Sequence, residues 1–335
     1  MKAVKVRNPA SLDTLEIADI ADPGDPGPGE IRVRIHASSL NFHDLGIVSG
    51  RSPTADGRIP MADGAGVVEA AGDGVDEFAT GDHVLSTFFP DWTDGEPRIA
   101  DFSRTPGDGI DGYARERVVA PASWFTHAPE GWSHAETATL TTAGLTAWRA
   151  LVVHGRIKAG DSVLVLGTGG VSIFALQFAK AMGARVIATS SSDDKLERVR
   201  AMGADHCINY KTTPEWGAAV REATGGRGVD HVIEVGGPGT LPQSIDAVRI
   251  GGHIALIGVL TGGSGDVPTA RLMAKQARLH GLIVGNRREQ QDLVRALDTL
   301  DIRPVIDRSF ALGDIADAFR HEQSGGHLGK IVLEY

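Results

Sequence analysis

Apolar and polar residues alternate in short segments along the first third of the chain. Residues 31–35 follow the two-residue period of a half-buried strand, and residues 66–70 and 83–85 predict further short strands. The preceding residues 22–29, rich in Asp, Pro and Gly, predict a turn. We therefore expect residues 1 to about 125 to form a β-rich domain.

The rhythm changes near residue 161, where strand-sized apolar segments begin to alternate with helical ones. A helical segment at about 133–153 precedes this region, and further helices are predicted at 171–182 and 195–202. Six segments have the length and apolar character of buried strands: 162–166, 185–189, 206–209, 231–235, 253–258 and 280–284. Six strands separated by crossovers predict a parallel, doubly wound sheet in an α/β fold.

Near its end the chain returns to strand character. Residues 328–333 predict a closing strand that joins the first domain. We therefore divide the chain into a catalytic domain of residues 1–125 and 300–335 and a dinucleotide-binding domain of residues 126–299.

A glycine-rich turn follows the first strand of the second domain. Gly167 permits a tight turn, Gly169 lets the backbone approach a pyrophosphate, and Gly170 and Val171 open the next helix. Free N–H groups at that helix N-terminus favour an anion. Ser172 takes the place of the third glycine of the dinucleotide fingerprint. A glycine turn alone can lack any ligand, but six alternating units around it favour a dinucleotide site.

The type of dinucleotide is read about 20 residues further on, at the end of the second strand. Ser190 stands where an acidic residue would bind the ribose of NAD, and Ser191 and Lys195 could hold the 2′-phosphate of NADP. The serines could instead cap the next helix, with Asp193 and Asp194 complementing its dipole. NADP(H) is preferred, and NAD(H) stays possible.

Two later strands also end in glycine. Gly236 follows the predicted strand 231–235. Gly258 is the last residue of the predicted strand 253–258, and Val259 comes directly after it. A doubly wound sheet binds its ligand at the carboxyl ends of its strands. We therefore predict that these three residues contact the cofactor, with Val259 beside the nicotinamide.

Charge and composition exclude several classes of function. The formal net charge is −10 and no basic block occurs, so nucleic acid is not an expected partner. The single cysteine, Cys207, excludes an internal disulfide and a multi-cysteine metal site. No apolar stretch has the length of a signal peptide or a membrane helix. These features predict a soluble cytoplasmic protein with no membrane partner.

Five motifs spread over nearly the whole length resemble the medium-chain dehydrogenase/reductase superfamily, and within it the zinc-free quinone oxidoreductase-like branch. They are Ser-Leu-Asn-Phe-His-Asp at 39–44, Gly-Ala-Gly-Val-Val-Glu at 64–69, Thr-Ala-Gly-Leu-Thr-Ala-Trp at 142–148, the glycine turn, and Gly-His-Leu-Gly-Lys at 326–330. The resemblance implies a GroES-like catalytic domain joined to a Rossmann domain, with the active site in the cleft between them. It also implies that Thr142 and Thr146 contact cofactor or substrate. A homodimer would form partly through edge pairing of residues 279–284.

The resemblance also allows zinc positions to be compared. Zinc-dependent members carry Cys, a His-Glu pair and a second Cys or Asp, where this chain has Asn41, Ala62–Asp63 and Thr142. Their cysteine-bearing lobe corresponds to residues 86–112, which contain no cysteine. Catalytic zinc needs about three N, S or carboxylate ligands, so we expect no metal.

Candidate catalytic side chains cluster at Asn41, His43 and Asp44. The Asn41 amide can donate to a carbonyl oxygen, and the His43 imidazole can donate a proton near neutral pH. His43 also falls where the superfamily's alcohol enzymes relay the substrate proton. Asp44 could orient His43 or cap the following helix, and all three residues could instead be structural.

Without a metal, conjugate reduction is the less demanding chemistry, because charge spreads into an enolate that hydrogen-bond donors can stabilise. The sequence therefore predicts a zinc-independent NAD(P)H-dependent reductase of quinones or α,β-unsaturated carbonyls. A metal-free alcohol/aldehyde oxidoreductase and a non-catalytic NADPH-binding protein remain alternatives.

Overall fold

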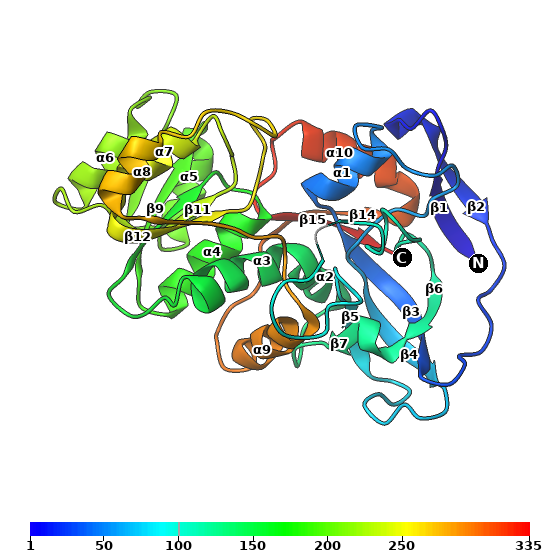
Figure 1. The fold of residues 1–335 in the computed structure, drawn as a ribbon. Helices are drawn as coiled ribbons and strands as arrows, with labels where there is room; N and C mark the ends of the chain where they lie inside the picture. Colours follow the sequence, from blue (N-terminus) through cyan, green and yellow to red (C-terminus); the bar gives the residue numbers. More distant parts are fainter. Residues whose placement is uncertain (100) are drawn as a thin grey trace. The chain divides into compact units, whose positions relative to one another are not determined.

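The computed structural model describes residues 1–99 and 101–335, and these form two compact units (Figure 1). Unit 1 comprises Met1–Leu145 and Val284–Tyr335, and unit 2 comprises Thr146–Ile283.

These limits differ from the sequence-based boundaries at residues 126 and 299. Helix α2 (His134–Ala138) packs on strands of the unit 1 sheet, and so does helix α9 (Arg287–Leu297). Both segments therefore belong to unit 1 rather than to the dinucleotide-binding unit.

Unit 1 is built around a sheet of seven strands in the order β14-β15-β3-β4-β5-β7, with β6 also paired to β3. A separate hairpin pairs β1 with β2. All pairs are antiparallel except β14 with β15. The strands of unit 1 are β1 (Lys2–Val6), β2 (Leu15–Asp19), β3 (Glu30–Ser39), β4 (Ala65–Ala71), β5 (His83–Ser86), β6 (Arg117–Pro121), β7 (Phe125–His127), β14 (Ile306–Ala311) and β15 (Lys330–Glu334).

The long strand β3 joins the C-terminal segment to the sheet of unit 1. Its hydrophobic residues alternate with partly exposed ones over most of its length, as residues 31–35 predicted. Its last residues pair with β15, with Val332 opposite Ser39. Residues 328–333 were predicted to return to the first domain, and this pairing confirms it. The helices of unit 1 include α1 (Phe42–Val48), α2, α9 and α10 (Ile315–Gln323).

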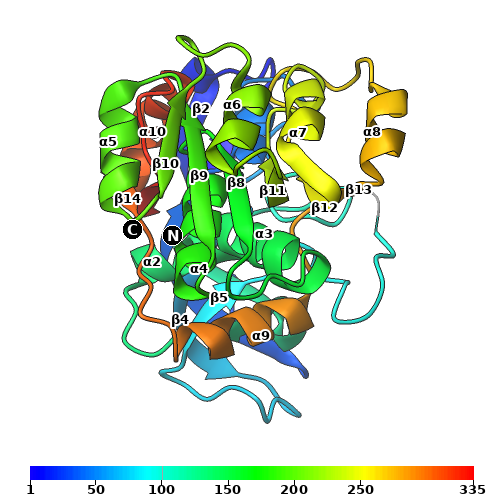
Figure 2. The ribbon, with the colours of Figure 1, turned by 90° about the vertical axis from the view of Figure 1, so that its left-hand side faces the viewer.

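Unit 2 contains a six-stranded parallel sheet in the order β10-β9-β8-β11-β12-β13. Figure 2 shows the six strands side by side in this order. The strands are β8 (Ser162–Leu166), β9 (Arg185–Ser190), β10 (His206–Asn209), β11 (Val229–Glu234), β12 (Val248–Leu256) and β13 (Arg278–Gly281), and the helices are α4 (Gly170–Ala181), α5 (Asp193–Ala201), α6 (Trp216–Ala223), α7 (Leu241–Ala247) and α8 (Thr269–Lys275). In chain order this is the 3-2-1-4-5-6 arrangement of a Rossmann sheet, as the sequence predicted.

The predicted helix at 133–153 is continuous in space but irregular. It comprises α2, a π-helical turn Leu140–Gly144, α3 (Leu145–Trp148) and a second π-helical turn Arg149–His154. Wide turns of this kind are rare inside helices and often accompany functional sites. Thr142 lies in the first of them.

No helix within the described part of the chain is long and apolar enough to cross a bilayer.

Candidate functional site

The glycine turn of unit 2 fits a pyrophosphate group. It connects β8 to α4, and Gly167 has a positive φ of 71° while its N–H donates to the Thr189 carbonyl at 2.9 Å. A Cβ atom added at Gly167 or Gly169 would meet no atom within 4 Å, so backbone is open there to a ligand. Ser172, the residue in place of the third glycine, is buried and donates to the Leu166 carbonyl at 2.6 Å. This ties α4 closely to β8.

The anion-binding capacity of this turn comes from α4. Gly169 precedes the helix with extended backbone, and Gly170 and Val171 form its first turn. The N–H groups of that turn have no partner within the helix, and the dipole of a twelve-residue helix adds partial positive charge. The turn lies beside the boundary between β8 and β11, where the strand order reverses and doubly wound sheets bind ligands.

At the end of β9, the serines form a small hydrogen-bonded loop. The hydroxyl of buried Ser190 accepts the Ser192 N–H at 3.3 Å, and the Ser192 hydroxyl accepts the Lys195 N–H at 3.4 Å. Ser192 is therefore the residue that caps α5. Ser191 and the Lys195 side chain are partly exposed beside it, so they are the groups of this loop that a 2′-phosphate could reach.

A buried carboxylate that the sequence analysis did not single out organises the end of β11. Glu234 is fully buried, and its Oε1 accepts the N–H groups of Gly236 and Gly237 at 2.8 and 3.0 Å. It also accepts the hydroxyl protons of Thr240, at 2.5 Å, and Ser244. An acidic residue directly after the apolar pair Val232–Ile233, at the carboxyl end of a predicted buried strand, was the signal that could have identified it.

The neighbouring strand end requires glycine for another reason. A Cβ atom at Gly258 would lie 2.1 Å from the Val235 carbonyl oxygen, so no larger residue fits. Val259, which follows it, is 54% exposed.

In unit 1, Asn41 lies at the centre of a buried polar cluster where β3 runs into α1. Its Nδ2 lies 3.0 Å from Asp63 Oδ2, 3.1 Å from Asp44 Oδ2 and 3.3 Å from the Ser39 carbonyl. Its Oδ1 accepts from Lys330 Nζ at 2.6 Å. The Asn41 amide thus connects the carboxylates of Asp44 and Asp63 to the ammonium of Lys330. Its hydrogens already donate to acceptors within the protein.

Asp63 and Thr142 join this cluster from two other segments. Asp63 has no exposed surface and accepts the Thr142 hydroxyl at 2.5 Å and the Ser39 hydroxyl at 2.5 Å. Burial raises the pKa of Asp63, against the opposing effects of Lys330 and of its hydroxyl and amide donors. The structure therefore brings Asn41, Asp63 and Thr142 together, as the resemblance implied.

Lys330 is the second functional candidate that the sequence analysis did not single out. It is 4% exposed and donates to the Leu40 carbonyl as well as to Asn41. Burial lowers its pKa, while Asp63, Glu322 and Asp44 act in the opposite direction. Its sequence signals were its position at the end of the 326–330 motif and inside the closing strand, 289 residues from Asn41.

Asp44 combines a capping role with charge. Its carboxylate accepts the Asn41 N–H at 3.0 Å and the Ala62 N–H at 2.9 Å, which fixes the start of α1 and the segment before β4. Burial, with a smaller contribution from Asp63, raises the pKa of Asp44 to about 6. The charges of Asp63 and Asp44 both act on the ammonium of Lys330, whose hydrogen bonds go to Leu40 and Asn41.

His43 differs from its neighbours because it is accessible. Its side chain is 22% exposed, and its Nε2 lies 3.3 Å from Asp108 Oδ2. Burial lowers its pKa, but Asp108, Asp44 and Asp63 outweigh this, so the pKa of His43 is raised. With Asp108 beside Nε2, Nδ1 is the ring nitrogen left to meet a substrate.

The segment of residues 86–112 surrounds His43 with aromatic rings. The ring centroids of Phe88 and Phe102 lie 5.5 and 4.7 Å from that of His43. Phe89 and Trp92, from the same segment, are also buried. Asp108 lies in this segment as well, so a stretch that looks like a polar loop in sequence supplies both an apolar wall and the carboxylate partner of His43.

The residues at the compared zinc positions do not form a ligand set. Asp63 is the one carboxylate among Asn41, Asp63 and Thr142, both of its oxygens already accept hydrogen bonds, and a buried ammonium is its electrostatic partner. In residues 1–99 and 101–335 no three His, Cys, Asp or Glu side chains are placed to hold a metal ion.

The predicted site residues thus form two groups. Asn41, His43, Asp44 and Thr142 lie in unit 1, and the glycine turn and the β9, β11 and β12 strand ends lie in unit 2. Thr146 is buried at the beginning of unit 2, and its predicted contact with cofactor or substrate stays a prediction.

Comparison with known proteins agrees with this division. Residues 27–130 match the family described as alcohol dehydrogenase GroES-like domain, and residues 170–300 match the family described as zinc-binding dehydrogenase. The second match does not include positions 41, 63 or 142, so its description does not bear on their ligand set.

Whole-chain relatives have the same architecture. A zinc-type alcohol dehydrogenase-like protein of Schizosaccharomyces pombe is 41% identical over 92% of this chain and 91% of its own length. A solved NAD-dependent alcohol dehydrogenase is 34% identical with a TM-score of 0.90 and complete coverage of both chains. Quinone oxidoreductase of Pseudomonas syringae pv. tomato is 28% identical with a TM-score of 0.82, covering 100% of this chain and 99% of its own. This chain belongs to the medium-chain dehydrogenase/reductase superfamily and is an NAD(P)-dependent oxidoreductase with a GroES-like and a Rossmann domain.

Proposed function

We propose that this protein uses NADPH to reduce quinones or α,β-unsaturated carbonyl compounds without a zinc ion. The observation that supports this most directly is the polar cluster around Asn41. An amide, two carboxylates and the buried Lys330 ammonium occupy the region where zinc-dependent relatives would need metal ligands.

Conjugate reduction suits such a site for an electrostatic reason. Reduction of an isolated ketone concentrates negative charge on one oxygen, which zinc normally stabilises as a Lewis acid. Reduction of an enone or quinone spreads that charge into an enolate, which a hydrogen-bond donor can stabilise. The nicotinamide supplies the hydride when bound, and the chain supplies orientation, electrostatics and a proton.

His43 is the group best suited to supply that proton. Asn41 has its amide hydrogens engaged by carboxylates, whereas His43 is partly exposed and its Nδ1 has no hydrogen-bond partner among the described residues. Asp108 at Nε2 orients the ring and favours the imidazolium form, and in that form Nδ1 carries a proton to donate. Phe88 and Phe102 restrict water around the ring.

The direct test is the identity of the product. Purified protein, with zinc content measured by elemental analysis, would be given NADPH with a cyclic enone or a benzoquinone. We expect the enone to become the saturated ketone with its carbonyl intact, and treatment with a chelator to leave the rate unchanged. Recovery of the allylic alcohol alone, or a rate that depends on stoichiometric zinc, would reject the proposal.

The same assay separates the alternatives. The His43–Asp108 pair can also exchange a proton with an alcohol oxygen, which supports a metal-free alcohol/aldehyde oxidoreductase. That alternative predicts turnover of aldehydes but not of enones. Tight NADPH binding with no turnover on any enone, quinone or aldehyde would instead support a non-catalytic NADPH-binding protein.

The preference for NADP(H) over NAD(H) belongs to this proposal, and Lys195→Ala tests it. A charge-assisted contact with the 2′-phosphate contributes about 1.5–3 kcal/mol, so loss of Lys195 should weaken NADPH binding more than about tenfold. NADH, which lacks that phosphate, should bind with unchanged affinity and serves as the control. A loss of less than about threefold for NADPH would show that Lys195 makes no useful phosphate contact.

We also propose a homodimer in which two copies of β13 pair edge to edge. Among the strands described here, β13 pairs only with β12, so its other edge leaves backbone donors and acceptors unpaired. Sedimentation velocity that gives a monomer at all concentrations would contradict this.

A further inference from the structure

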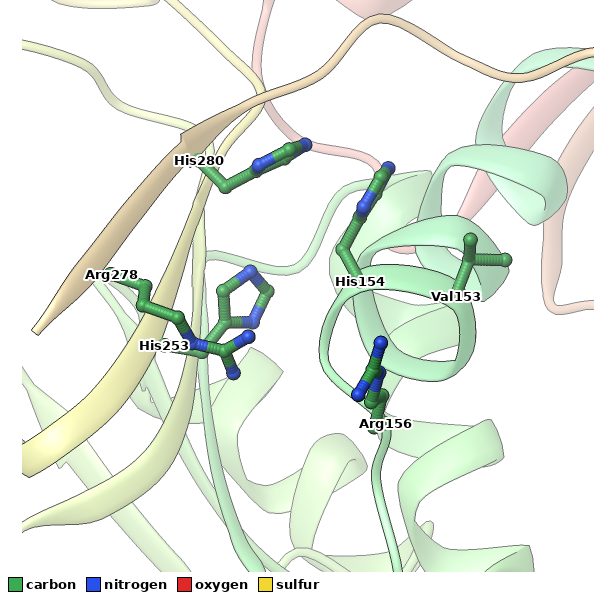
Figure 3. A pocket seen from close by; sticks show the side chains of 6 residues that line it. All are labelled: Val153, His154, Arg156, His253, Arg278 and His280. Atoms are coloured by element: carbon green, nitrogen blue, oxygen red, sulfur yellow. The ribbon is translucent and has the colours of Figure 1, made fainter. Parts of the chain in front are cut away.

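One face of the unit 2 sheet carries a cluster of basic and imidazole side chains around a cavity of about 150 Å³. Figure 3 shows the side chains that line it: Val153, His154, Arg156, His253, Arg278 and His280. A single water needs about 10–15 Å³ of such space. The cavity therefore has room for a small polyatomic ligand.

The register of the parallel strands explains why these residues meet. His253 on β12 lies beside Arg278 on β13 and beside His231 on β11. Neighbours in register point to the same face of a sheet, and His280, two residues after Arg278, points there as well. His154 and Arg156 come from the end of the second π-helical turn and the residues that follow it, and they face His280 and Arg278 across the cavity (Figure 3).

His253 is the residue that indicates a missing ligand. It is 1% exposed, and both of its ring nitrogens are buried without a hydrogen-bond partner. Nε2 of His154 is also buried and unpartnered. Buried polar atoms nearly always have a partner, so an atom aimed into a cavity without one points to a bound ligand or water.

The charges around the cavity select an anion. Its lining includes two arginines and no carboxylate. In the described part of the chain neither Arg156 nor Arg278 forms an ion pair or a side-chain hydrogen bond.

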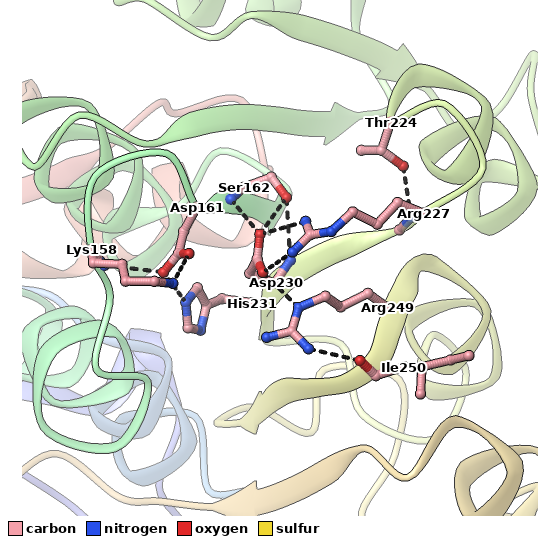
Figure 4. Close-up of polar contacts among 10 residues, drawn as sticks. Lys158, Asp161, Ser162, Thr224, Arg227, Asp230, His231, Arg249 and Ile250 are labelled. Atoms are coloured by element: carbon pink, nitrogen blue, oxygen red, sulfur yellow. Dashed lines mark hydrogen bonds and ion pairs between the residues drawn. The ribbon is translucent and has the colours of Figure 1, made fainter.

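The two acidic residues that act on His231, Asp161 and Asp230, are already paired (Figure 4). Asp161 contacts Lys158 and His231, the latter at 3.2 Å. Asp230 forms ion pairs of 2.7 Å with Arg227 and 2.6 Å with Arg249. Among the described residues, the two guanidinium groups at the cavity therefore have no counter-ion.

This cavity is separate from the dinucleotide turn within unit 2. His231, which pairs laterally with His253, is also in register with Val163, the second residue of β8. The glycine turn begins four residues later, about 13 Å further along the strand at roughly 3.3 Å per residue. The cavity therefore lies toward the amino ends of the strands, whereas a dinucleotide binds at the carboxyl ends.

We propose that this cavity is a binding site for a phosphate-type oxyanion, held by the guanidinium groups of Arg156 and Arg278 and by the imidazoles of His154, His253 and His280. A divalent metal fits less well, because two permanently charged guanidinium groups repel it. No three imidazoles or carboxylates in the described residues are placed as metal ligands.

Occupation of the site is coupled to proton uptake. Without a ligand, burial and the neighbouring cationic groups lower the pKa of His253 to about 3 and that of His154 to about 4. The groups that face these two rings are His231 on β11, Arg278 and His280 on β13, and Arg149 at the start of the second π-helical turn. Lys158, Asp161 and Asp230 lie beyond His231. A bound anion stabilises the imidazolium forms and raises both pKa values, so binding should tighten as the pH falls.

Isothermal titration calorimetry of the full chain with inorganic phosphate tests the site. We expect a dissociation constant of about 1 mM or below near neutral pH, and a loss of at least about tenfold for Arg156→Gln and for Arg278→Gln. Both side chains are exposed, so the variants should fold, and unchanged NADPH binding would confirm it. Arg221→Gln, an exposed arginine on α6, is the matched control and should bind phosphate like the wild type.

Two further binding experiments define the chemical class of the ligand. Glycerol phosphate binding more tightly than inorganic phosphate would identify a phosphorylated metabolite as the source, and the reverse order would identify the free ion. Sulfate, which keeps its charge, should bind more tightly at about pH 5.5 than at about pH 8, because the bound anion raises the pKa values of His154 and His253 above those of the empty site, so that binding takes up protons as the pH falls. The proposal is overturned if none of these anions binds, if both arginine variants bind like the wild type, or if zinc alone binds at the site.

Discussion

Replacement of Lys330 by methionine is expected to lower the stability of unit 1 by about 3–5 kcal/mol near pH 8. Methionine keeps the length of the side chain but removes the one ammonium of a cluster that holds Asp63 and Asp44. Loss of one partner of a buried ionic group leaves an uncompensated charge, and Asn41 Oδ1 also loses its donor. For a unit of this size the loss corresponds to a fall of roughly 6–20 °C in the thermal transition.

The pH dependence of this loss has a definite sign. The pKa of Asp44 in the folded protein, about 6, lies above its ordinary value of 3.8, so ionisation of Asp44 costs stability as the pH rises through that range. The difference between variant and wild type should therefore shrink below about pH 6, where Asp44 becomes neutral. Calorimetric scans over this range would measure it.

Two controls separate charge from packing. Lys330→Arg retains the charge and should recover part of the stability. Lys2→Met removes an exposed partner of Asp19, whose ion pair measures 2.7 Å, and should leave the thermal transition nearly unchanged. If Lys330→Met melts like the wild type at about pH 8, the ammonium does not hold the cluster together.

Replacement of His43 by glutamine is expected to lower kcat/KM for an enone by about 10²–10⁴, the usual contribution of a positioned general acid. Binding of NADPH should be unaffected, because the glycine turn lies in unit 2. Glutamine retains a hydrogen-bond donor but cannot give up a proton, so a small residual rate would measure hydrogen bonding alone.

Asp108→Asn tests how His43 is held. His43 must be protonated to act as an acid, so kcat/KM should fall as the pH rises through its pKa. Asp108 raises that pKa, and its loss should therefore move the alkaline fall in kcat/KM to lower pH. A structural effect would lower the rate equally at all pH values, and that result would exclude this positioning role. Asp91→Asn, an exposed carboxylate of the same segment paired with Arg104, is the matched control.

The features that could be predicted from sequence are those that neighbouring residues determine. The strand, glycine turn and helix at 162–181 form one continuous segment. The hydrophobic period and the glycines of that segment were therefore sufficient to predict all three. The six strands of unit 2 follow from the same alternation, with ends displaced by a few residues where loops extend or shorten pairing. The closing strand was visible because its apolar residues are consecutive.

The features that sequence did not reveal depend on contacts between distant segments. Lys330 and Asn41 are 289 residues apart, and no local pattern distinguishes a buried lysine from an exposed one in a strand. Asp108 is one of several acids in residues 86–112, and only the folded segment selects it as the neighbour of His43. The boundaries between the units depend on helices α2 and α9, which pack on the unit 1 sheet. Hydrophobic periodicity predicts a helix but not the sheet on which it packs.

The placement of Lys330 on the last strand affects how the protein matures during synthesis. Unit 2 is made from one uninterrupted stretch, so all of its contacts become available before residues 284–335 emerge from the ribosome. The sheet of unit 1 lacks β14 and β15 until then, and Asp44 and Asp63 have no ammonium to neutralise them. Unit 2 can thus assemble first, whereas the buried polar cluster of unit 1 is completed only after β15 has been synthesised.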